Sequence, residues 1–207
     1  MIHVLIVEDQ RMTRENLEHC IEKSDDYRLI ASITNAGFAE MSCMQHHIDL
    51  VLMDVCTEND ESGFVATEKI KARFPKVKVV IITSMMDFGY LEKARRVGAD
   101  SLWYKDVGCE ELKSVIERTL NGESVYPDRT PEITLGNTTS DEFSQAEIRV
   151  LRLLVEGMTY RQMAEALGIT TDGVKAHISS MLSKTGYTSK TKLAAVVTSK
   201  KLIVNGF

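Results

Sequence analysis

The sequence predicts an α/β fold: a doubly wound (βα)5 domain with a parallel five-stranded sheet, followed by a small all-α domain of four helices. Short apolar runs of the length of buried strands alternate with stretches of helical periodicity as far as residue 121. A polar stretch rich in Ser, Thr, Pro, Asp and Gly follows, and beyond it the chain carries only helical periodicity and helix-capping signals. We therefore predict domains over residues 1–121 and 143–207, joined by a linker over residues 122–142.

The composition suits a protein with a well-filled core and no membrane segment. Of 207 residues, 43% are hydrophobic and only 3 are proline, so the chain can bury a core without metals or disulfides. No apolar run approaches the roughly eighteen residues that a membrane-spanning helix needs. The N-terminus enters a predicted strand at once, which is not typical of a signal peptide. We expect a cytoplasmic protein.

The cysteines and histidines do not predict a metal site. No Cys-x-x-Cys pair occurs, and a reducing compartment would leave all four cysteines as buried thiols, namely Cys20, Cys43, Cys56 and Cys109. The neighbours His46 and His47 diverge by about 100° on a helix, and we expect no carboxylate partner near them. A solvated helix end is the better interpretation of this pair.

The net charge of -5 conceals an asymmetry between the two halves. Residues 1–126 carry about -7, whereas residues 140–207 carry about +3. A mild positive excess in a small C-terminal domain is compatible with a nucleic-acid partner, although it does not by itself identify one.

Charged side chains follow the predicted strands at their C-terminal ends. The buried run of residues 50–53 leads to Asp54, and the first strand leads to Glu8 and Asp9. Two later strands end at Thr83 and Lys105. Because ligands bind at the C-terminal edge of an open parallel sheet, we expect these groups to share one pocket.

Three carboxylates within a few ångströms raise one another's pKa values unless a cation lies between them. Hard oxygen ligands favour Mg²⁺, with Glu8 and Asp9 holding the metal beside Asp54. A carboxylate next to Mg²⁺ and an ammonium can attack phosphorus and form an aspartyl phosphate. In this hypothesis Asp54 is the nucleophile, while Thr83 and Lys105 contact the phosphoryl oxygens.

The N-terminal region resembles the receiver domain of bacterial response regulators. The resemblance covers residues 1–121 and rests on four motifs in that family's order, Val7-Glu8-Asp9, Met53-Asp54, Ile82-Thr83-Ser84 and Tyr104-Lys105-Asp106. It implies that Asp54 is the phosphoacceptor and that the backbone carbonyl of Cys56 completes the metal ligands of Glu8, Asp9 and Asp54.

Three positions depart from the receiver pattern. The loop of residues 55–62 reaches Gly63 one residue late and lacks the usual Met-Pro pair, so we expect it to be longer and looser. Leu102 stands at the switch position where many receivers have an aromatic residue, and Trp103 beside it should face the other way. Asp106 replaces a frequent proline. The usual switch would then be blunted or routed differently.

The C-terminal quarter has the dimensions of a helix-turn-helix. Ser144 and Glu147 form a predicted capping box that opens one helix. A helix over about residues 160–167 stops at Gly168, and Thr170 caps the next. The second member of such a pair enters the DNA major groove. A further helix is predicted over about residues 190–199.

Residues 143–203 resemble the LuxR-type DNA-binding domain, and the whole chain resembles a NarL/FixJ-type response regulator. The matching positions are Glu147, Val150-Leu151-x-Leu153-Leu154, Glu156-Gly157, Met163-Ala164, Leu167-Gly168-Ile169 and Val174-Lys175-Ala176-His177. The resemblance implies groove and phosphate contacts from Thr170, Thr171, Lys175, Ala176, Ser179, Lys184 and Lys190. We expect His177 to be a packing residue.

These features together favour a two-component response regulator that controls transcription. A sensor histidine kinase would phosphorylate Asp54, and the active protein would bind double-stranded DNA as a homodimer. We expect no enzymatic turnover beyond slow autodephosphorylation. One alternative keeps DNA binding but uses an atypical receiver as a phosphorylation-independent dimerisation module. Another is a phosphohydrolase, which would need a general acid where Cys56 stands.

Overall fold

The computed structural model describes residues 1–85, 87, 89–105, 108–127 and 132–203. The chain divides into two compact units, one formed by residues 1–85 and 89–127, the other by residues 132–203 together with Asp87. Asp106, one of the positions that depart from the receiver pattern, lies outside the described residues.

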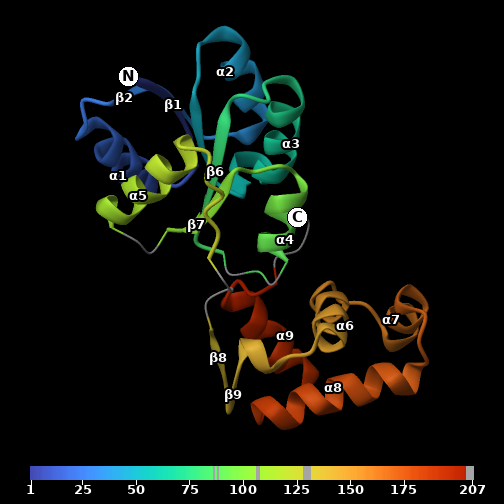
Figure 1. Ribbon diagram of the computed structural model, residues 1–207. Helices are drawn as coiled ribbons and strands as arrows, with labels where there is room; N and C mark the ends of the chain where they lie inside the picture. Colours follow the sequence, from blue (N-terminus) through green and yellow to red (C-terminus); the bar gives the residue numbers. More distant parts are fainter. Residues whose placement is uncertain (86, 88, 106–107, 128–131, 204–207) are drawn as a thin grey trace. The chain divides into compact units, whose positions relative to one another are not determined.

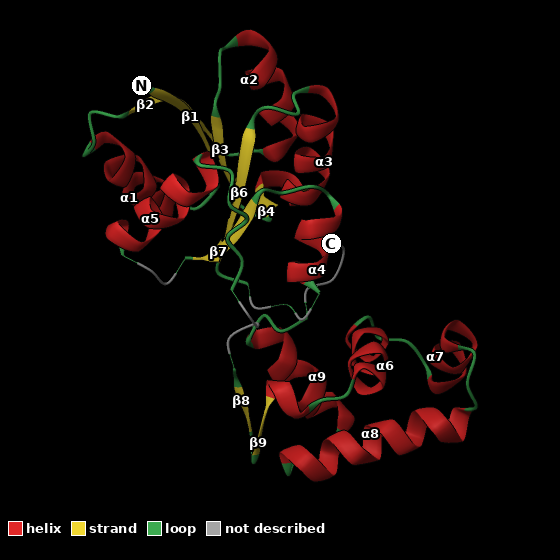
Figure 2. Ribbon diagram, viewed as in Figure 1, coloured by secondary structure: helices red, strands yellow, loops and turns green. Residues whose placement is uncertain are grey.

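The N-terminal unit is built on a five-stranded sheet in the order β2-β1-β3-β6-β7, in which every neighbouring pair is parallel (Figures 1 and 2). The strands are β1 (Ile2–Val7), β2 (Tyr27–Ile33), β3 (Leu50–Met53), β6 (Lys78–Thr83) and β7 (Ser101–Tyr104). The order reverses beside β1, where the chain turns to build the other half of the sheet. This is the doubly wound topology that the sequence predicted.

Helices cover both faces of this sheet. α1 (Arg11–Glu22) and α5 (Cys109–Leu120) lie on one face, while α2 (Ala39–Gln45) and α3 (Gly63–Arg73) lie on the other (Figure 1). α4 (Tyr90–Arg96) lies on the α3 side. A short 3-10 turn, Ala36–Phe38, precedes α2.

The alternation of strand side chains explains the two cores. Val4 and Ile6 of β1 pack beneath α1 and α5, whereas Leu5 and Val7 pack beneath α2 and α3. Both sets are buried, so a strand of this sheet is apolar at consecutive positions. This requirement explains why the run of residues 50–53 contains no polar residue.

The loop that follows Asp54 is an ordered hairpin, so the prediction of a looser loop is wrong. β4 (Cys56–Thr57) and β5 (Glu61–Ser62) pair antiparallel around the 3-10 turn Glu58–Asp60. The Thr57 hydroxyl accepts a hydrogen bond from the Ala36 amide at 2.9 Å and donates one to the Glu61 carbonyl at 2.9 Å. The extra residue therefore belongs to a hairpin that is hydrogen-bonded to the 3-10 turn before α2.

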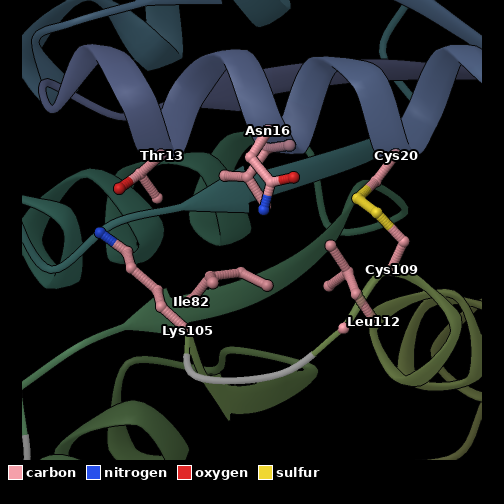
Figure 3. Close-up of a pocket in the computed structure, with 9 residues that line it drawn as sticks. Thr13, Asn16, Cys20, Ile82, Lys105, Cys109 and Leu112 are labelled. Atoms are coloured by element: carbon pink, nitrogen blue, oxygen red, sulfur yellow. A yellow bond between two sulfur atoms is a disulfide. The ribbon is translucent and has the colours of Figure 1, made fainter.

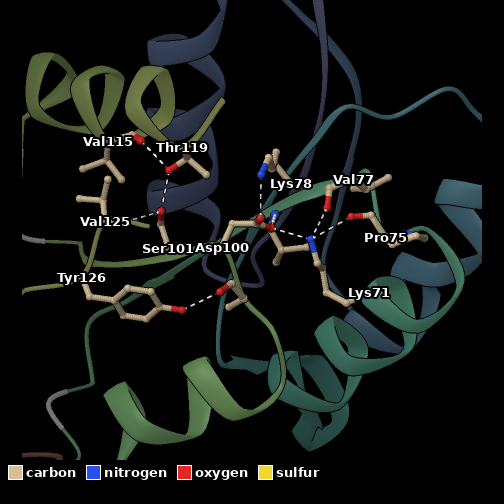
Figure 4. A network of polar contacts seen from close by, with 12 residues as sticks. Lys71, Pro75, Val77, Lys78, Asp100, Ser101, Val115, Thr119, Val125 and Tyr126 are labelled. Carbon is tan, nitrogen blue, oxygen red and sulfur yellow. Dashed lines mark hydrogen bonds and ion pairs between the residues drawn. The ribbon is translucent and has the colours of Figure 1, made fainter. Parts of the chain in front are cut away.

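A charged network closes the opposite, N-terminal edge of β6 and β7 (Figure 4). The Asp100 carboxylate accepts hydrogen bonds from Lys71 Nζ at 2.8 Å, Lys78 Nζ at 3.0 Å and the Val79 amide at 2.9 Å. Burial raises the pKa of Asp100, but these three donors outweigh burial and lower it. The network fixes the connection between α4 and β7.

The segment predicted as a linker is partly structured. Val125 is buried in the N-terminal unit, and its amide donates a hydrogen bond to Ser101 Oγ at 3.0 Å (Figure 4). Further on, β8 (Thr134–Leu135) and β9 (Thr138–Thr139) form a hairpin that buries Leu135 in the C-terminal unit. Both ends of the predicted linker thus belong to folded units.

The C-terminal unit is otherwise helical. After the 3-10 turn Ser140–Glu142 come α6 (Gln145–Val155), α7 (Tyr160–Leu167), α8 (Thr171–Thr185) and α9 (Lys190–Ser199). Their shared core includes Leu151, Met163, Ile178 and Leu193. Within the described ranges, no helix has both the length and the apolar composition needed to cross a membrane.

Cys20 of α1 and Cys109, the first residue of α5, are joined by a disulfide, contrary to the expectation that all four cysteines are thiols (Figure 3). Cys43 and Cys56 are free. The sequence could not suggest this pair, because its members lie 89 residues apart and meet only when both helices pack on the same face of the sheet. The bond ties α1 to the start of α5, and both cysteines line a small pocket that Lys105 also lines (Figure 3).

Because this bond closes a long loop, reduction should destabilise the N-terminal unit by about 2–4 kcal/mol. Urea unfolding of the full chain, followed through Trp103 with and without a reductant, measures this difference. The double variant C20S/C109S is the matched control and should show no response to the reductant. Alkylation of all four cysteines in protein unfolded without reductant would contradict the assignment.

Candidate functional site

Three carboxylates converge at the C-terminal edge of the sheet. Glu8 and Asp9 follow β1, Asp54 follows β3, and one oxygen from each lies within 4.8 Å of the others. The Asp54 amide donates to the Val7 carbonyl at 2.9 Å, which continues the ladder between the two strands as far as the acids. The predicted pocket is therefore assembled by strand pairing.

Lys105 places its ammonium between two of these carboxylates. Its Nζ lies 2.9 Å from Asp54 Oδ2 and 2.5 Å from Glu8 Oε2. The side chains are almost completely buried, with 8% of Lys105, 6% of Asp54 and none of Glu8 exposed. The Lys105 amide donates to the Thr83 carbonyl at 2.9 Å, so the end of β6 holds the lysine backbone in place.

The charge balance of this pocket is negative. Burial raises the pKa of Asp54 to about 7; the Lys105 ammonium opposes this rise and the Glu8 carboxylate adds to it. The Val55 amide donates to Asp54 Oδ1 at 2.8 Å and fixes the direction of the carboxylate. Two buried acids share one buried base, and Asp9 adds an exposed third acid.

This donor set fits a hard divalent cation such as Mg²⁺. All three groups are carboxylates, and the exposed Asp9 leaves one side open to solvent. Burial and the nearby acids Asp54, Asp60 and Asp9 raise the pKa of the Cys56 thiol to about 12, so without a metal ion the sulfur is protonated at neutral pH. The predicted role of Cys56 through its backbone carbonyl stays a prediction.

The two predicted switch positions lie in buried surroundings. Thr83 ends β6, and its hydroxyl accepts a hydrogen bond from the Met85 amide at 3.0 Å. Leu102 is fully buried in β7, whereas Trp103 packs into the core under α1 and α5. The two neighbours on β7 thus face opposite sides, as expected from strand alternation.

Gly63, the first residue of α3, was noted in the sequence only for its position in the loop. A Cβ atom at this residue would lie 1.9 Å from the backbone carbonyl oxygen of Asp54. Its amide donates to the Val55 carbonyl at 2.8 Å. The chain therefore needs glycine here to pass behind the candidate phosphoacceptor.

The helix-turn-helix geometry is formed by α7 and α8. Gly168 ends α7 with a φ of 65°, a left-handed conformation that glycine adopts without strain. Thr170 caps α8, its hydroxyl accepting a hydrogen bond from the Gly173 amide at 3.0 Å. The hydroxyl of this predicted contact residue is thus already used as a helix cap.

The remaining predicted DNA contacts divide into two groups. Thr171, Lys175, Ala176 and Ser179 are exposed on α8, where Lys175 Nζ lies 2.9 Å from Asp172 Oδ1. Lys184 is part-buried: it pairs with Glu147 at 2.8 Å and donates to the Glu142 carbonyl. Lys190 Nζ lies 4.3 Å from the centroid of the Tyr160 ring. Lys184 and Lys190 thus contact other residues of the C-terminal unit, and their contacts with DNA phosphates stay a prediction.

His177 lies on the inner side of α8, where it lines a small pocket with Val150, Leu167 and Ile169. It is half-buried, as expected for a packing residue.

Glu147 organises a polar cluster that the sequence only partly predicted. The capping box with Ser144 is present, and the same carboxylate also accepts hydrogen bonds from Ser180 and Lys184. Burial would raise the pKa of Glu147, but these donors outweigh it and lower the pKa to about 2. The cluster joins α6 to α8, whose outer face carries the candidate DNA contacts.

A buried carboxylate and ammonium at the C-terminal edge of a doubly wound sheet, combined with a helix-turn-helix unit, define a signalling protein of the receiver class with a regulatory output domain. Residues 4–117 match the family model of the response regulator receiver domain, and residues 141–197 match that of bacterial regulatory proteins of the luxR family. The chain belongs to the response regulators of the NarL/FixJ type.

Similar proteins support this assignment along the whole chain. The oxygen regulatory protein NreC of Staphylococcus haemolyticus is 28% identical over 97% of this chain and 98% of its own length, and NreC of Staphylococcus aureus strain MRSA252 is 29% identical with the same coverage. RcsB of Salmonella typhimurium has the same fold, with a TM-score of 0.59 at 16% identity over 96% of this chain and 100% of its own.

Replacing Gly63 with alanine should displace the Asp54 backbone and lower the free energy of unfolding of the N-terminal unit by about 1–3 kcal/mol. Urea unfolding monitored by Trp103 fluorescence provides the measurement. The control is Gly108→Ala, since no atom of the described residues lies within 4 Å of a Cβ there and the φ is -73°. If both substitutions lowered the free energy of unfolding equally, the close approach of Gly63 to the Asp54 carbonyl would be refuted.

The Glu147→Gln variant should lose about 1–3 kcal/mol of stability in the C-terminal unit at pH 7. Because the folded pKa lies below the ordinary value of 4.5, this contribution is fully present above about pH 5 and disappears as the pH falls toward 2. Calorimetry of wild type and variant across this range tests the difference. If the difference in stability between wild type and variant stayed constant on acidification, this result would argue against the ion pair of Glu147 with Lys184.

Proposed function

We propose that this protein accepts a phosphoryl group on Asp54 from a sensor histidine kinase, and that the modification controls dimerisation and sequence-specific binding to double-stranded DNA. The observation that carries the proposal is the buried Asp54 carboxylate, held 2.9 Å from the Lys105 ammonium and beside the acids that follow β1. A carboxylate in this setting is oriented, poorly hydrated and close to a cation that can balance new negative charge.

The proposed reaction is a phosphoryl transfer between two side chains. An Asp54 oxygen attacks the phosphorus of a phosphohistidine, the P–O bond forms as the P–N bond breaks, and the leaving imidazole takes up a proton from solvent. Lys105 would move from the free carboxylate to a phosphoryl oxygen, and the Thr83 hydroxyl would donate to another. Glu8 and Asp9 would hold Mg²⁺, which supplies positive charge to the phosphoryl oxygens when bound.

The output we propose is DNA binding by the exposed face of α8. Thr171, Lys175, Ala176 and Ser179 lie on this face, in a region that carries a charge of about +3 over residues 140–207. RcsB, which shares the fold, has been solved in complex with DNA and as two dimers on two parallel DNAs. One small domain binds weakly, so pairing of two copies would raise the effective affinity.

The free energy that phosphorylation can supply is modest, but it is large enough to change DNA affinity measurably. A phosphoryl group adds close to two negative charges, which can bias a poised equilibrium by about 1–3 kcal/mol. A bias of this size changes DNA affinity by about 5–150-fold. We propose no enzymatic turnover beyond slow loss of the phosphoryl group. We also propose a cytoplasmic location where kinase and DNA are both accessible, in which the Cys20–Cys109 bond is exposed to reduction.

The ordered hairpin of residues 56–62 and the buried Leu102 favour a second candidate function. In this alternative the receiver does not respond to phosphorylation and serves as a constitutive dimerisation module for DNA binding. Leu102 has no ring to rotate inward, so the motion that couples pocket to surface in an aromatic switch is unavailable at this position.

Incubation with acetyl phosphate and Mg²⁺, followed by intact mass measurement and DNA-binding titration, separates the two functions. Wild type should gain the mass of one phosphoryl group and bind DNA at least fivefold more tightly, while Asp54→Asn should do neither. Asp60→Asn, which alters an exposed acid of the neighbouring hairpin, should behave as wild type.

If wild type gained no phosphoryl group and bound DNA equally well with and without phosphodonor, the phosphorylation-controlled function would be overturned. The constitutive dimerisation module would then be supported. Modification without any change in DNA affinity would remove the proposed coupling. Hydrolysis of acetyl phosphate over many turnovers would contradict the absence of an enzymatic role.

A further inference from the structure

Two histidines and one aspartate gather at the N-terminal edge of the sheet, at the end opposite the candidate phosphoacceptor. His3 lies in β1, while His47 and Asp49 lie in the connection between α2 and β3. His3 Nδ1 is 3.0 Å from Asp49 Oδ2, and His47 Nε2 is 3.2 Å from Asp49 Oδ1. One ligand atom from each residue lies within 4.8 Å of the other two.

This arrangement contradicts the expectation that His47 has no carboxylate partner. The carboxylate comes from Asp49, two residues along the chain, and the second imidazole comes from a neighbouring strand. His46, the other member of the sequence pair, does not belong to the group. Only the parallel pairing of β1 with β3 brings His3 to this point.

The backbone holds the three residues in place. The His3 amide donates to Asp49 Oδ2 at 2.8 Å, and the Asp49 amide donates to the His3 carbonyl at 2.9 Å. The two imidazole rings meet edge to face with centroids 5.1 Å apart. The carboxylate and His3 are thus fixed by the sheet before any ligand arrives, which reduces the ordering that binding requires.

The chemistry of the three side chains differs from that of the acidic pocket. Imidazole nitrogens favour zinc and similar transition-metal ions, whereas a set made only of carboxylates favours Mg²⁺. Tetrahedral ligands with bonds of about 2.0–2.2 Å to zinc lie roughly 3.3–3.6 Å apart. His3 Nδ1 lies 3.0 Å from Asp49 Oδ2 and His47 Nε2 lies 3.2 Å from Asp49 Oδ1, so the two imidazoles contact different oxygens of one carboxylate. Both imidazoles must move outward from these hydrogen-bonding distances to admit the ion.

We propose that His3, His47 and Asp49 form a binding site for one divalent transition-metal ion of the zinc class, with water at the remaining position. The site has access to solvent, because 76% of the His47 side chain and 30% of the Asp49 side chain are exposed. Both residues also line an open groove that extends along Pro75 and Lys76. This inference does not depend on the proposed function of Asp54.

Titration of the full chain with Co²⁺ and then Zn²⁺, in saturating Mg²⁺ to occupy the acidic pocket, tests the site. Wild type should bind one Co²⁺ with the visible absorption of a four-coordinate ion and no thiolate charge-transfer band. Zn²⁺ should displace it and raise the melting temperature. His47→Gln and His3→Gln should each weaken binding at least tenfold.

His47→Gln is the decisive variant, since its side chain is 76% exposed and its replacement leaves the core packing unchanged. His46→Gln is its matched control and should bind as wild type, because His46 lies on the same groove but outside the group. Wild-type affinity in His47→Gln, a strong thiolate band, or loss of the bound ion in Asp54→Asn would each overturn the proposal.

Discussion

The ion cluster of Lys105 with Glu8 and Asp54 is the interaction on which the N-terminal unit is organised. Transferring three ionised groups from water into a protein interior is costly, and their mutual attraction offsets that cost only when the geometry is closely controlled. Here the control comes from the strands, since each charged residue directly follows one that is hydrogen-bonded to its neighbours. The apolar runs form the paired strands, and the paired strands in turn position the charged residues at the edge of the sheet.

Several of these features could be predicted from the sequence because they depend on local pattern. Consecutive apolar residues indicate strands buried on both faces, and strands of one parallel sheet must deliver their last residues to a common edge. The sequence therefore predicts that Glu8, Asp54 and Lys105 lie together. It contains no comparable signal for Cys20 with Cys109, or for His3 with Asp49 and His47. Those groups depend on which helices and strands become neighbours, and no local pattern records that choice.

In the C-terminal unit, too, the sequence predicts the local features but not the contacts between distant residues. Capping residues act within one turn of helix, so Ser144, Thr170 and Gly168 marked the helix ends closely. The long side chains of Lys184 and Lys190 can reach several partners, and in the folded unit they contact Glu147 and Tyr160. A lysine in a recognition region thus has a structural alternative that only its three-dimensional surroundings reveal.

Burial and the neighbouring charges control the protonation of the Asp54 carboxylate. Titration of its side-chain ¹³C resonance in the full chain, with and without Mg²⁺, measures this directly. We predict a pKa of about 7 without the cation and a clear decrease when Mg²⁺ is present. An ordinary pKa near 4 that does not respond to Mg²⁺ would contradict a shared, cation-binding pocket.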